Sequence, residues 1–372
     1  MYWLPMTSNM KERRSKLLQH ITEIGCDAVA VFQPENVFYL TQFWGEAIAI
    51  CIVNNDAKTK IITPKLEIDR AQRSSRDCEI ISTERGSDMI SSIISELDGN
   101  IVCTDCDDYY SINMIQNKIG KKSFVVNSEP FFQTRRVKDE EEIKSISEAA
   151  RILDILFQIC TEEIKVGLSE RELQAKIIYE AMKMGASPVF YRSTMNPLII
   201  AGGSNSALPH AQVSDRKFIK GDMIVVDLTL RYEGYIADAT RTFALGSPTS
   251  EMKHVYNIVK QSQQAGMDAA NDGSFCSYVD AACRSVIEKS GYAKYFIHSA
   301  GHGIGLEVHE PPWLRIKNQE VLKTNMTITI EPGIYIKDKF GVRIEDSVIV
   351  KTQDKGSIMN LNAFTKELLV LG

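Results

Sequence analysis

The chain has 372 residues, of which 44% are hydrophobic and 24% are charged, the composition of a globular protein long enough for two domains. Its net charge of −5 and its isoelectric point near 5.8 argue against a nucleic-acid-binding protein, which usually carries a strong basic excess. Eight cysteines without a compact spacing indicate reduced thiols. The apolar run at residues 1–6 is too short for a signal peptide, and no run of about 18 apolar residues follows, so we expect a cytoplasmic protein without membrane contact.

The first third of the chain alternates between helical and strand-like patterns. Apolar residues at helical spacing predict helices over residues 11–24 and 89–97. Strands are predicted at residues 28–32, 47–53, 60–62, 79–82, 101–103 and 124–126. This alternation predicts a small α/β domain, and we place its end at residue 133 because residues 134–142 are almost wholly polar.

Cys103 and Cys106 form a lone C-x-x-C pair after one of these strands. Zinc and redox sites of this type need a second such pair or added histidines, and no second pair exists. Two buried structural thiols are the preferred interpretation, and a redox or zinc role is the alternative.

The rest of the chain shows the order helix pair, hairpin, helix pair, hairpin. Asp139 is expected to cap a long helix with an acidic first turn, and Ser169-Glu-Arg-Glu172 is a capping box for the next helix. A second helix pair is predicted near residues 250–270 and 277–290, with Ser277 as the cap of the latter. The order indicates two structurally similar halves, although no sequence repeat is visible.

The first hairpin, residues 225–243, places two carboxylates within apolar strands. A turn centred on residues 232–233 would oppose Asp227 and Asp238, with Cβ atoms roughly 4.5–5.5 Å apart. Two buried carboxylates at that distance repel each other and lose hydration, so we expect a metal ion between them. The alternatives are a solvated sheet edge, or a register that differs by one residue and separates the two side chains.

The second hairpin, residues 328–346, repeats this arrangement. Glu331 and Glu345 are equidistant from Asp338, so a loop around residues 337–341 would oppose them across the hairpin. The apolar residues on both sides indicate that these strands are buried as well.

Three of the six histidines lie within residues 297–312, between the two hairpins. Glycines at positions 301, 303 and 305 favour an extended backbone that approaches another segment closely, with His298 and His302 on one strand face. A fourth histidine, His210, ends a loop rich in glycine, serine and asparagine that follows a strand, the kind of loop that presents a residue to a ligand.

Four carboxylates and one imidazole form an oxygen-rich set that suits two divalent ions of the Mn, Co, Fe or Zn type. The four negative charges balance two dications. A hydroxide that bridges the ions would then be a nucleophile near neutral pH, as in two-metal hydrolases.

Five motifs together resemble metallopeptidases with the pita-bread fold, specifically prolidase and aminopeptidase P. They are Val-Asp227-Leu-Thr, Ala-Asp238-Ala-Thr-Arg-Thr, Gly-His302-Gly-Ile-Gly-Leu-Glu-Val-His309-Glu, Glu331-Pro-Gly and Gly-Val-Arg343-Ile-Glu345-Asp. The resemblance covers nearly the whole chain. It implies an α/β (α+β) protein with a creatinase-like N-terminal domain, residues 1–133, and a pita-bread catalytic domain with pseudo-twofold halves, residues 134–372.

The resemblance also implies a ligand set. Asp227 would bind one metal, Asp238 and Glu345 would bridge the two, and His302 and Glu331 would bind the other. Mn or Co is expected, with Zn and Fe as alternatives.

The same resemblance implies catalytic roles. His210 and His309 would face the substrate, with His298 nearby, and Glu331 would transfer a proton. Arg343 lies two residues before Glu345 on the same strand face, so it can brace a ligand carboxylate.

The predicted activity is that of a dinuclear metallo-exopeptidase that cleaves the Xaa-Pro bond of short peptides with proline in second position, as a prolidase does. Aminopeptidase P activity on longer peptides is the first alternative, and a non-catalytic peptide-binding protein is the second. A homodimer is implied by the resemblance alone.

Overall fold

The computed structural model describes residues 10–52, 58–118, 120, 122–190, 198–352, 354 and 357–372. The apolar run at residues 1–6, the end of the predicted strand at residue 53 and the start of the His210 loop at Pro197 lie outside these residues. The chain divides into two compact units, Met1–Arg135 and Arg136–Gly372. Within the described ranges, no helix is long and apolar enough to cross a membrane.

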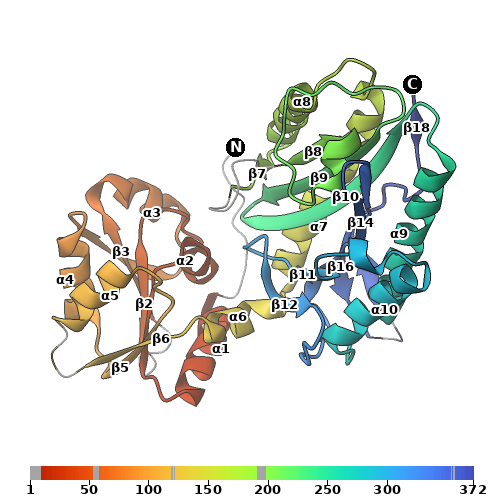
Figure 1. Cartoon of the computed structure of the whole chain (residues 1–372). Helices are drawn as coiled ribbons and strands as arrows, with labels where there is room; N and C mark the ends of the chain where they lie inside the picture. Colours follow the sequence, from red (N-terminus) through yellow and green to blue (C-terminus); the bar gives the residue numbers. More distant parts are fainter. Residues whose placement is uncertain are drawn as a thin grey trace. The chain divides into compact units, whose positions relative to one another are not determined.

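The first unit is a six-stranded mixed sheet with strand order β4-β3-β2-β1-β5-β6. Figure 1 shows α4 and α5 on one side of this sheet and α1 and α2 on the other. The strands are β1 (Ala28–Val31), β2 (Ile48–Ile52), β3 (Thr59–Pro64), β4 (Cys78–Thr83), β5 (Ile101–Thr104) and β6 (Ser123–Val126). The helices are α1 (Met10–Glu23), α2 (Pro34–Thr41), η1 (Lys65–Glu67), α3 (Ile68–Ser74), α4 (Ser87–Glu96), α5 (Tyr109–Gln116) and α6 (Glu129–Arg136).

Cys103 and Cys106 are buried free thiols in this unit. Their sulfur atoms lie against backbone carbonyls, 3.6 Å from Asn127 O and 3.8 Å from Asp108 O. Burial raises the pKa of Cys103 to about 12, and a protonated thiol is a poor nucleophile and a poor metal ligand. These contacts favour the structural interpretation of the pair.

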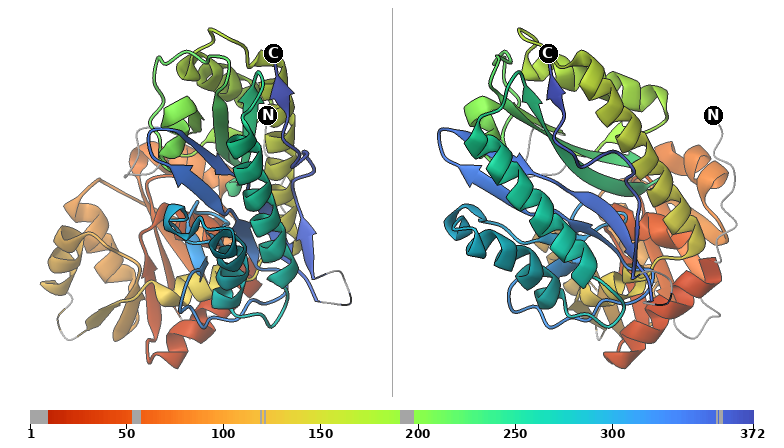
Figure 2. Two further views of the ribbon diagram at one scale, coloured as in Figure 1. Left: turned by 45° about the vertical axis from the view of Figure 1, so that its right-hand side comes forward. Right: turned by 90° about the vertical axis from the view of Figure 1, so that its right-hand side faces the viewer.

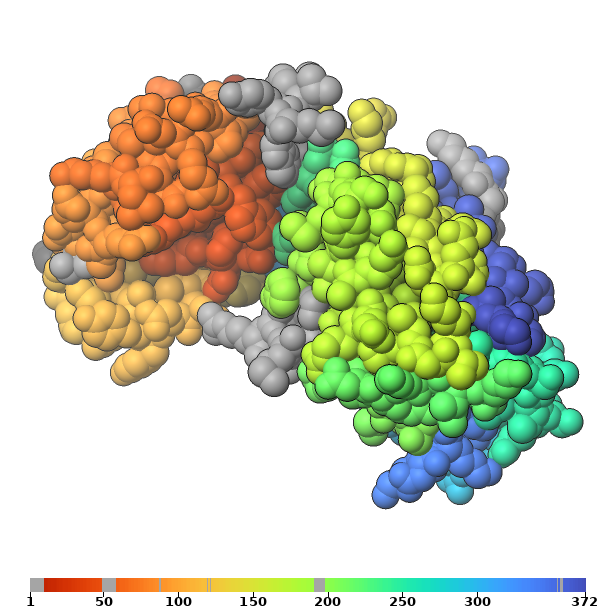
Figure 3. Space-filling model, turned by 90° about the horizontal axis from the view of Figure 1, so that it is seen from above, coloured from red at the N-terminus to blue at the C-terminus, as the bar shows by residue number. Residues whose placement is uncertain are grey.

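The second unit contains two helix pairs and two larger sheets. Helices α7 (Glu140–Glu163) and α8 (Glu170–Lys183) belong with the sheet β18-β10-β9-β7, in which β8 also pairs with β9. Helices α9 (Ser250–Ala269) and α10 (Cys276–Lys289) pack on the sheet β12-β11-β13-β16-β17. The predicted order of helix pairs and hairpins is confirmed, and Figure 2 shows α9 running beside the strands of its half. In Figure 3, α7, α8 and the segment after them, yellow to green, form much of the visible surface of this unit.

The strands of the second unit are β7 (Ser187–Pro188), β8 (Ile199–Gly202), β9 (Met223–Tyr232), β10 (Tyr235–Leu245), β11 (Gly301–Gly303), β12 (Glu310–Leu314), β13 (Thr327–Ile330), β14 (Gly333–Ile336), β15 (Phe340–Arg343), β16 (Asp346–Val350), β17 (Ile358–Asn360) and β18 (Val370–Leu371). Two short 3₁₀ helices, η2 (Gly203–Ala207) and η3 (Ala293–Tyr295), lie between them. β14 and β15 form a separate two-stranded ribbon.

Of the four helices α7 to α10 of the second unit, three begin at a residue whose side chain caps the helix, and α10 does not. Asp139 and Ser169 each form a complete capping box, as predicted. Ser277 is not a cap, because α10 begins at Cys276 after Phe275, which has no side-chain cap. The backbone N–H of Ser277 instead donates to Asn318 O at 2.9 Å.

Candidate metal centre

The first hairpin, β9 and β10, has a different turn from the predicted one. Residues 233 and 234 form a two-residue turn with φ values of 47° and 89°. This turn shifts the register by two residues, so that Asp227 pairs with Thr240 and Asp238 pairs with Thr229. Because side chains alternate with a period of two, a shift of two leaves both aspartates on one face. The prediction that Asp227 and Asp238 are directly opposed is wrong, and so are the alternatives of a one-residue offset and a solvated edge, since Asp238 is buried.

The second hairpin has the predicted register. Gly333 pairs with Arg343 in the β14–β15 ladder and Ile330 pairs with Asp346 in the β13–β16 ladder, and this common register places Glu331 across from Glu345. The backbone N–H of Glu331 donates to Ala300 O at 2.8 Å, and that of Glu345 donates to Thr240 O at 3.1 Å. These bonds attach one glutamate to the histidine segment and the other to the first hairpin.

His302 lies in β11 between two glycines. A Cβ atom at residue 303 would lie 2.5 Å from Pro311 O, so the close approach that the glycines predict is present. Nδ1 of His302 lies 3.0 Å from Gly303 O. A carbonyl only accepts hydrogen bonds, so Nδ1 carries the proton and Nε2 presents a lone pair.

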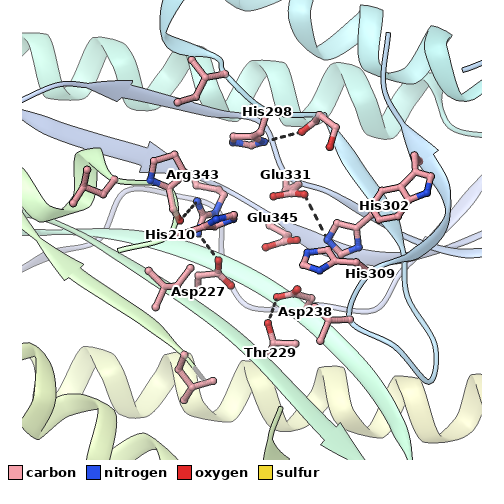
Figure 4. A pocket seen from close by; sticks show the side chains of 18 residues that line it. His210, Asp227, Thr229, Asp238, His298, His302, His309, Glu331, Arg343 and Glu345 are labelled. Atoms are coloured by element: carbon pink, nitrogen blue, oxygen red, sulfur yellow. Dashed lines mark hydrogen bonds and ion pairs between the residues drawn. The ribbon is translucent and has the colours of Figure 1, made fainter. Parts of the chain in front are cut away.

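All nine residues with a sequence-predicted role line one cavity of about 580 Å³, shown in Figure 4. They are His210, Asp227, Asp238, His298, His302, His309, Glu331, Arg343 and Glu345. Asp238, His302, Arg343 and Glu345 are buried in its floor, whereas His210 and His309 are exposed.

Three ligand-type side chains form a compact group in this cavity. Donor atoms of Asp238, His302 and Glu345 all lie within 4.8 Å of one another. Glu331 adds a carboxylate oxygen 3.6 Å from Nε2 of His302. Asp227 lines the same cavity, and its carboxylate is ion-paired with Arg343.

The electrostatics of these side chains are unfavourable without added positive charge. Burial, followed by repulsion from neighbouring acids, raises the pKa of Asp238 and that of Glu331 well above their ordinary values. Burial and the charge of Asp227 raise the pKa of Glu345 to about 8. Burial lowers the pKa of His302 to about 3, so its imidazole is neutral.

The donor set fits divalent metal ions. The lone pair of His302 Nε2 faces an oxygen of Glu331, and two groups that only accept hydrogen bonds repel unless a proton or a cation lies between them. Carboxylates with one imidazole are suitable ligands for Mn, Co, Fe or Zn. A dication at this position would replace the protons that the raised pKa values otherwise retain.

Arg343 contacts several polar side chains in the wall of the cavity. Its guanidinium binds Asp227, lies 3.2 Å from Thr240 Oγ1 and donates to the hydroxyl of Tyr335 at 2.7 Å. Thr240 Oγ1 in turn lies 2.7 Å from a carboxylate oxygen of Glu345. Arg343 therefore contacts one acidic side chain directly and a second through a threonine.

His298 does not share a strand face with His302, because it precedes β11. Its Nδ1 lies 2.8 Å from Ser299 O, so Nδ1 carries the proton and Nε2 accepts a hydrogen bond from the Tyr335 hydroxyl, whose oxygen is 2.9 Å away. Burial lowers the pKa of His298 to about 3. His298 is therefore neutral, and both of its ring nitrogens already have partners in the protein.

His309 lies beside His302 in the cavity. Its ring centroid is 4.5 Å from that of His302, and it stacks on the indole of Trp313 at 6.3 Å with an interplanar angle of 21°. The cavity walls shield the ring from water, and this loss of hydration lowers the pKa of His309. In Figure 4, His210 lies on the other side of the cavity, beside Arg343 and Asp227.

Sequence reasoning missed Thr229, which donates to an oxygen of Asp238 at 2.9 Å, and three further residues around the site. Thr240 and Tyr335 supply the hydroxyls that connect Arg343 to Glu345 and His298, and Trp313 supports His309. Thr240 lies two residues after Asp238 and shares its strand face, so alternation could have indicated it. Tyr335 is the one polar side chain of the strand Gly-Ile-Tyr-Ile, a weaker signal, and nothing local indicates Trp313.

Two family models together match most of this chain. The model of metallopeptidase family M24 matches residues 144–352, and the model of the creatinase/prolidase N-terminal domain matches residues 13–138. The chain belongs to metallopeptidase family M24. It is 36% identical to a Xaa-Pro dipeptidase of Pyrococcus furiosus over 345 residues, which cover 92% of this chain and 95% of that protein.

Solved structures of a Xaa-Pro dipeptidase and an X-Pro aminopeptidase are similar to this chain over almost its whole length. A Xaa-Pro dipeptidase from Bacillus anthracis superimposes with a TM-score of 0.89 at 31% identity, covering 98% of this chain and 100% of that one. An X-Pro aminopeptidase from Thermotoga maritima gives a TM-score of 0.83 at 32% identity, covering 95% and 100%. These findings confirm the predicted family and the predicted fold class, a creatinase-like domain followed by a pita-bread domain.

The raised carboxylate pKa values predict how pH affects the metal-free M24 domain. A folded state that retains protons which the unfolded chain releases loses stability as pH rises, here up to the Glu345 pKa of about 8. The histidines with lowered pKa values act in the opposite direction, but only below the ordinary histidine pKa of 6.5. We therefore expect the unfolding temperature of the chelated protein to decrease as the pH is raised from 6.5 to 8.

Calorimetry with and without Mn²⁺ measures this effect, because bound metal should remove most of the slope. The variant Glu345→Gln should have a smaller slope than the chelated wild type. A midpoint of the chelated protein that rises across this window would contradict the argument.

Proposed function

We propose that this protein is a dinuclear-metal Xaa-Pro dipeptidase, which hydrolyses the bond between the first residue of a short peptide and a proline in second position. The observation that carries the proposal is the convergence of four carboxylates and the His302 imidazole on one cavity of a family M24 chain. Relatives over almost the full chain length carry the same activity in their names.

We propose that five residues would hold two divalent ions: Asp227, Asp238, His302, Glu331 and Glu345. Mn or Co is proposed first, with Zn or Fe as alternatives, because an oxygen-rich set with one imidazole suits all four. When bound, such ions lower the pKa of a water molecule and polarise the scissile carbonyl.

Glu331 is proposed to transfer the proton. Its carboxylate is half-buried and faces the cavity. A carboxylate in that position can accept the proton of the attacking water and return it to the leaving imide nitrogen of proline. The proline nitrogen is a poor leaving group without that proton.

The histidines divide the remaining tasks in this proposal. His309, supported by Trp313, donates a hydrogen bond to the oxygen that becomes negative during attack. His210 faces the substrate from the opposite wall, and His298 acts through Tyr335 and Arg343 to hold Asp227. Of the predicted catalytic residues, Arg343 and His298 are therefore proposed as positioning residues.

Aminopeptidase P activity on longer peptides is the second candidate, because an X-Pro aminopeptidase structure matches this chain at an identity similar to that of the dipeptidases. A cytoplasmic location, a homodimer and a domain boundary at residues 133–134 belong to the same proposal. The location rests on the lack of a run of about 18 apolar residues in the sequence. The homodimer rests on the family resemblance, and the boundary on the polar stretch that starts at residue 134.

Substrate choice tests the proposal directly. Xaa-Pro dipeptides should be cleaved with a kcat/KM at least tenfold above that of Xaa-Pro-Yaa tripeptides and far above that of Xaa-Ala dipeptides. Chromatographic detection of free proline measures all three series. A preference for the tripeptides would favour the aminopeptidase P candidate, and equal cleavage of the alanine series would indicate a general aminopeptidase.

Metal content is a separate expected outcome. The protein should bind about two divalent ions per chain, because one dication cannot balance four clustered carboxylates. Exhaustive chelation should abolish peptidase activity, and Mn²⁺ or Co²⁺ should restore it, as measured by elemental analysis beside the activity assay. Full activity in a chelated, metal-free sample would overturn the proposal.

His309→Ala separates transition-state stabilisation from metal binding. Removal of one oxyanion donor typically lowers kcat by about 10²–10³, so this variant should keep its metal and thermal midpoint yet lose kcat by that order. His302→Ala is the matched comparison and should lose metal affinity first. If His309→Ala has a normal kcat, or loses its metal together with activity, the assigned role is wrong.

A further inference from the structure

Lys138 and Glu310 form an ion pair that is shielded from solvent within the second unit. Nζ of Lys138 lies 2.8 Å from Oε1 of Glu310, and the two side chains are only 1% and 2% exposed. A buried ion pair is weak evidence for stability, because loss of hydration offsets most of the attraction, yet removal of one partner is severely unfavourable. The position of this pair, directly beside His309, points to a different task.

The lysine end is anchored next to a strand of the metal centre. The backbone N–H of Lys138 donates to Asn325 O at 3.0 Å, and Val137 forms an antiparallel bridge with Met326. Met326 immediately precedes β13, the strand that leads to Glu331. The backbone of Lys138 is therefore held in a fixed position relative to β13 and Glu331, one of the proposed metal ligands.

Glu310 contacts the loop formed by residues 304–309 through both its backbone and its carboxylate. Glu310 opens β12 and pairs with Gly303, at the start of this loop. Its carboxylate packs on Gly305, where an added Cβ would lie 2.5 Å from Oε1, and Oε2 is 3.4 Å from the backbone N of Glu307. One carboxylate thus contacts the loop at two points while being bonded to Lys138.

We propose that Lys138 is a positioning residue for His309. By binding Glu310, it keeps the carboxylate against Gly305 and Glu307 and closes the loop, at the end of which His309 faces the cavity. Closure brings the His309 ring to 4.5 Å from His302 and stacks it on Trp313. The inference rests on the proposed role of His309, and it assigns a part in catalysis to a residue outside every metal-ligand motif.

Lys138→Met tests the proposal, because methionine replaces the aliphatic part of the lysine side chain and removes only the ammonium group. The Glu310 carboxylate then loses the ammonium group that holds it against Gly305 and Glu307, so the loop opens and His309 is displaced. Small displacements of a reacting group cost up to about 10²-fold in rate, so kcat should fall about ten- to a hundred-fold, whereas KM and metal content stay near wild-type values.

Trp313 supplies a readout that does not depend on activity. In a background with Trp3→Phe and Trp44→Phe, the chain has one remaining tryptophan. Trp313 stacks on His309, so opening of the loop should increase acrylamide quenching of its emission at temperatures well below unfolding.

Two further variants separate positioning from simple stability. Leu156→Ala removes buried core volume in α7 and is the control for an equal loss of thermal midpoint. Lys138→Met/Glu310→Gln also removes the buried carboxylate charge, so it should be more stable than the single variant. It should still have the low kcat and the increased quenching, because the ion pair that closes the loop is missing.

The proposal is overturned if Lys138→Met has normal kcat and quenching, if Leu156→Ala reproduces both changes, or if the double variant restores both. It is also overturned if Lys138→Met loses metal in parallel with kcat. Failure of the wild-type protein to cleave Xaa-Pro peptides would instead refute the proposed function, and the Trp313 measurement would still decide whether Lys138 closes the loop.

Discussion

Crowding of acidic side chains around one neutral imidazole is the constraint on which the second unit depends. Asp238 and Glu345 are buried within 4.8 Å of His302, and burial raises the pKa of both acids. The protein brings them together by joining two separate sheets through the backbone bridge between Thr240 and Glu345. Burial of the two apolar cores on either side stabilises the fold enough to hold these acidic side chains together, although they repel each other until a cation is present.

The bridge between the sheets is reinforced from behind by a buried arginine. Nη1 of Arg241 donates to Glu345 O at 2.7 Å and to Thr240 O at 2.9 Å, and Nη2 binds Asp346 at 2.7 Å. The same guanidinium donates to the carbonyls of residues 364 and 365. The C-terminal segment therefore contributes to the position of Glu345 without entering the cavity, and Arg241 is suited to this because its five donors point in fixed directions.

Local patterns predicted the parts of the fold that depend on neighbouring residues. The capping boxes at Asp139 and Ser169 satisfy helix ends within four residues, so the sequence contains the whole interaction. Helix α2 was missed because its start is stabilised by Asp105, which accepts from the backbone of Phe32 and from Asn36 across about seventy positions. In the site, alternation predicted that Asp227 and Asp238 share a face, but the turn that sets their register depends on residues 233–234 adopting positive φ. Contacts such as that of Trp313 with His309 arise only from tertiary packing.

Arg343 changes the charge balance that the ligand set alone suggests. Four carboxylates and two dications would be neutral, and a hydroxide nucleophile would then make the centre anionic, which opposes further negative charge on the substrate carbonyl. The structure pairs Asp227 with a guanidinium inside the same cavity. With that charge included, a centre that held two dications would retain one positive charge for the nucleophile. The histidines near it are neutral, because burial lowers the pKa values of His298 and His302. A neutral imidazole can donate one directed hydrogen bond without adding charge, so His309 can favour the developing oxyanion over the uncharged substrate. In the proposed mechanism Arg343 therefore sets the overall charge, and His309 supplies the directional preference for the transition state.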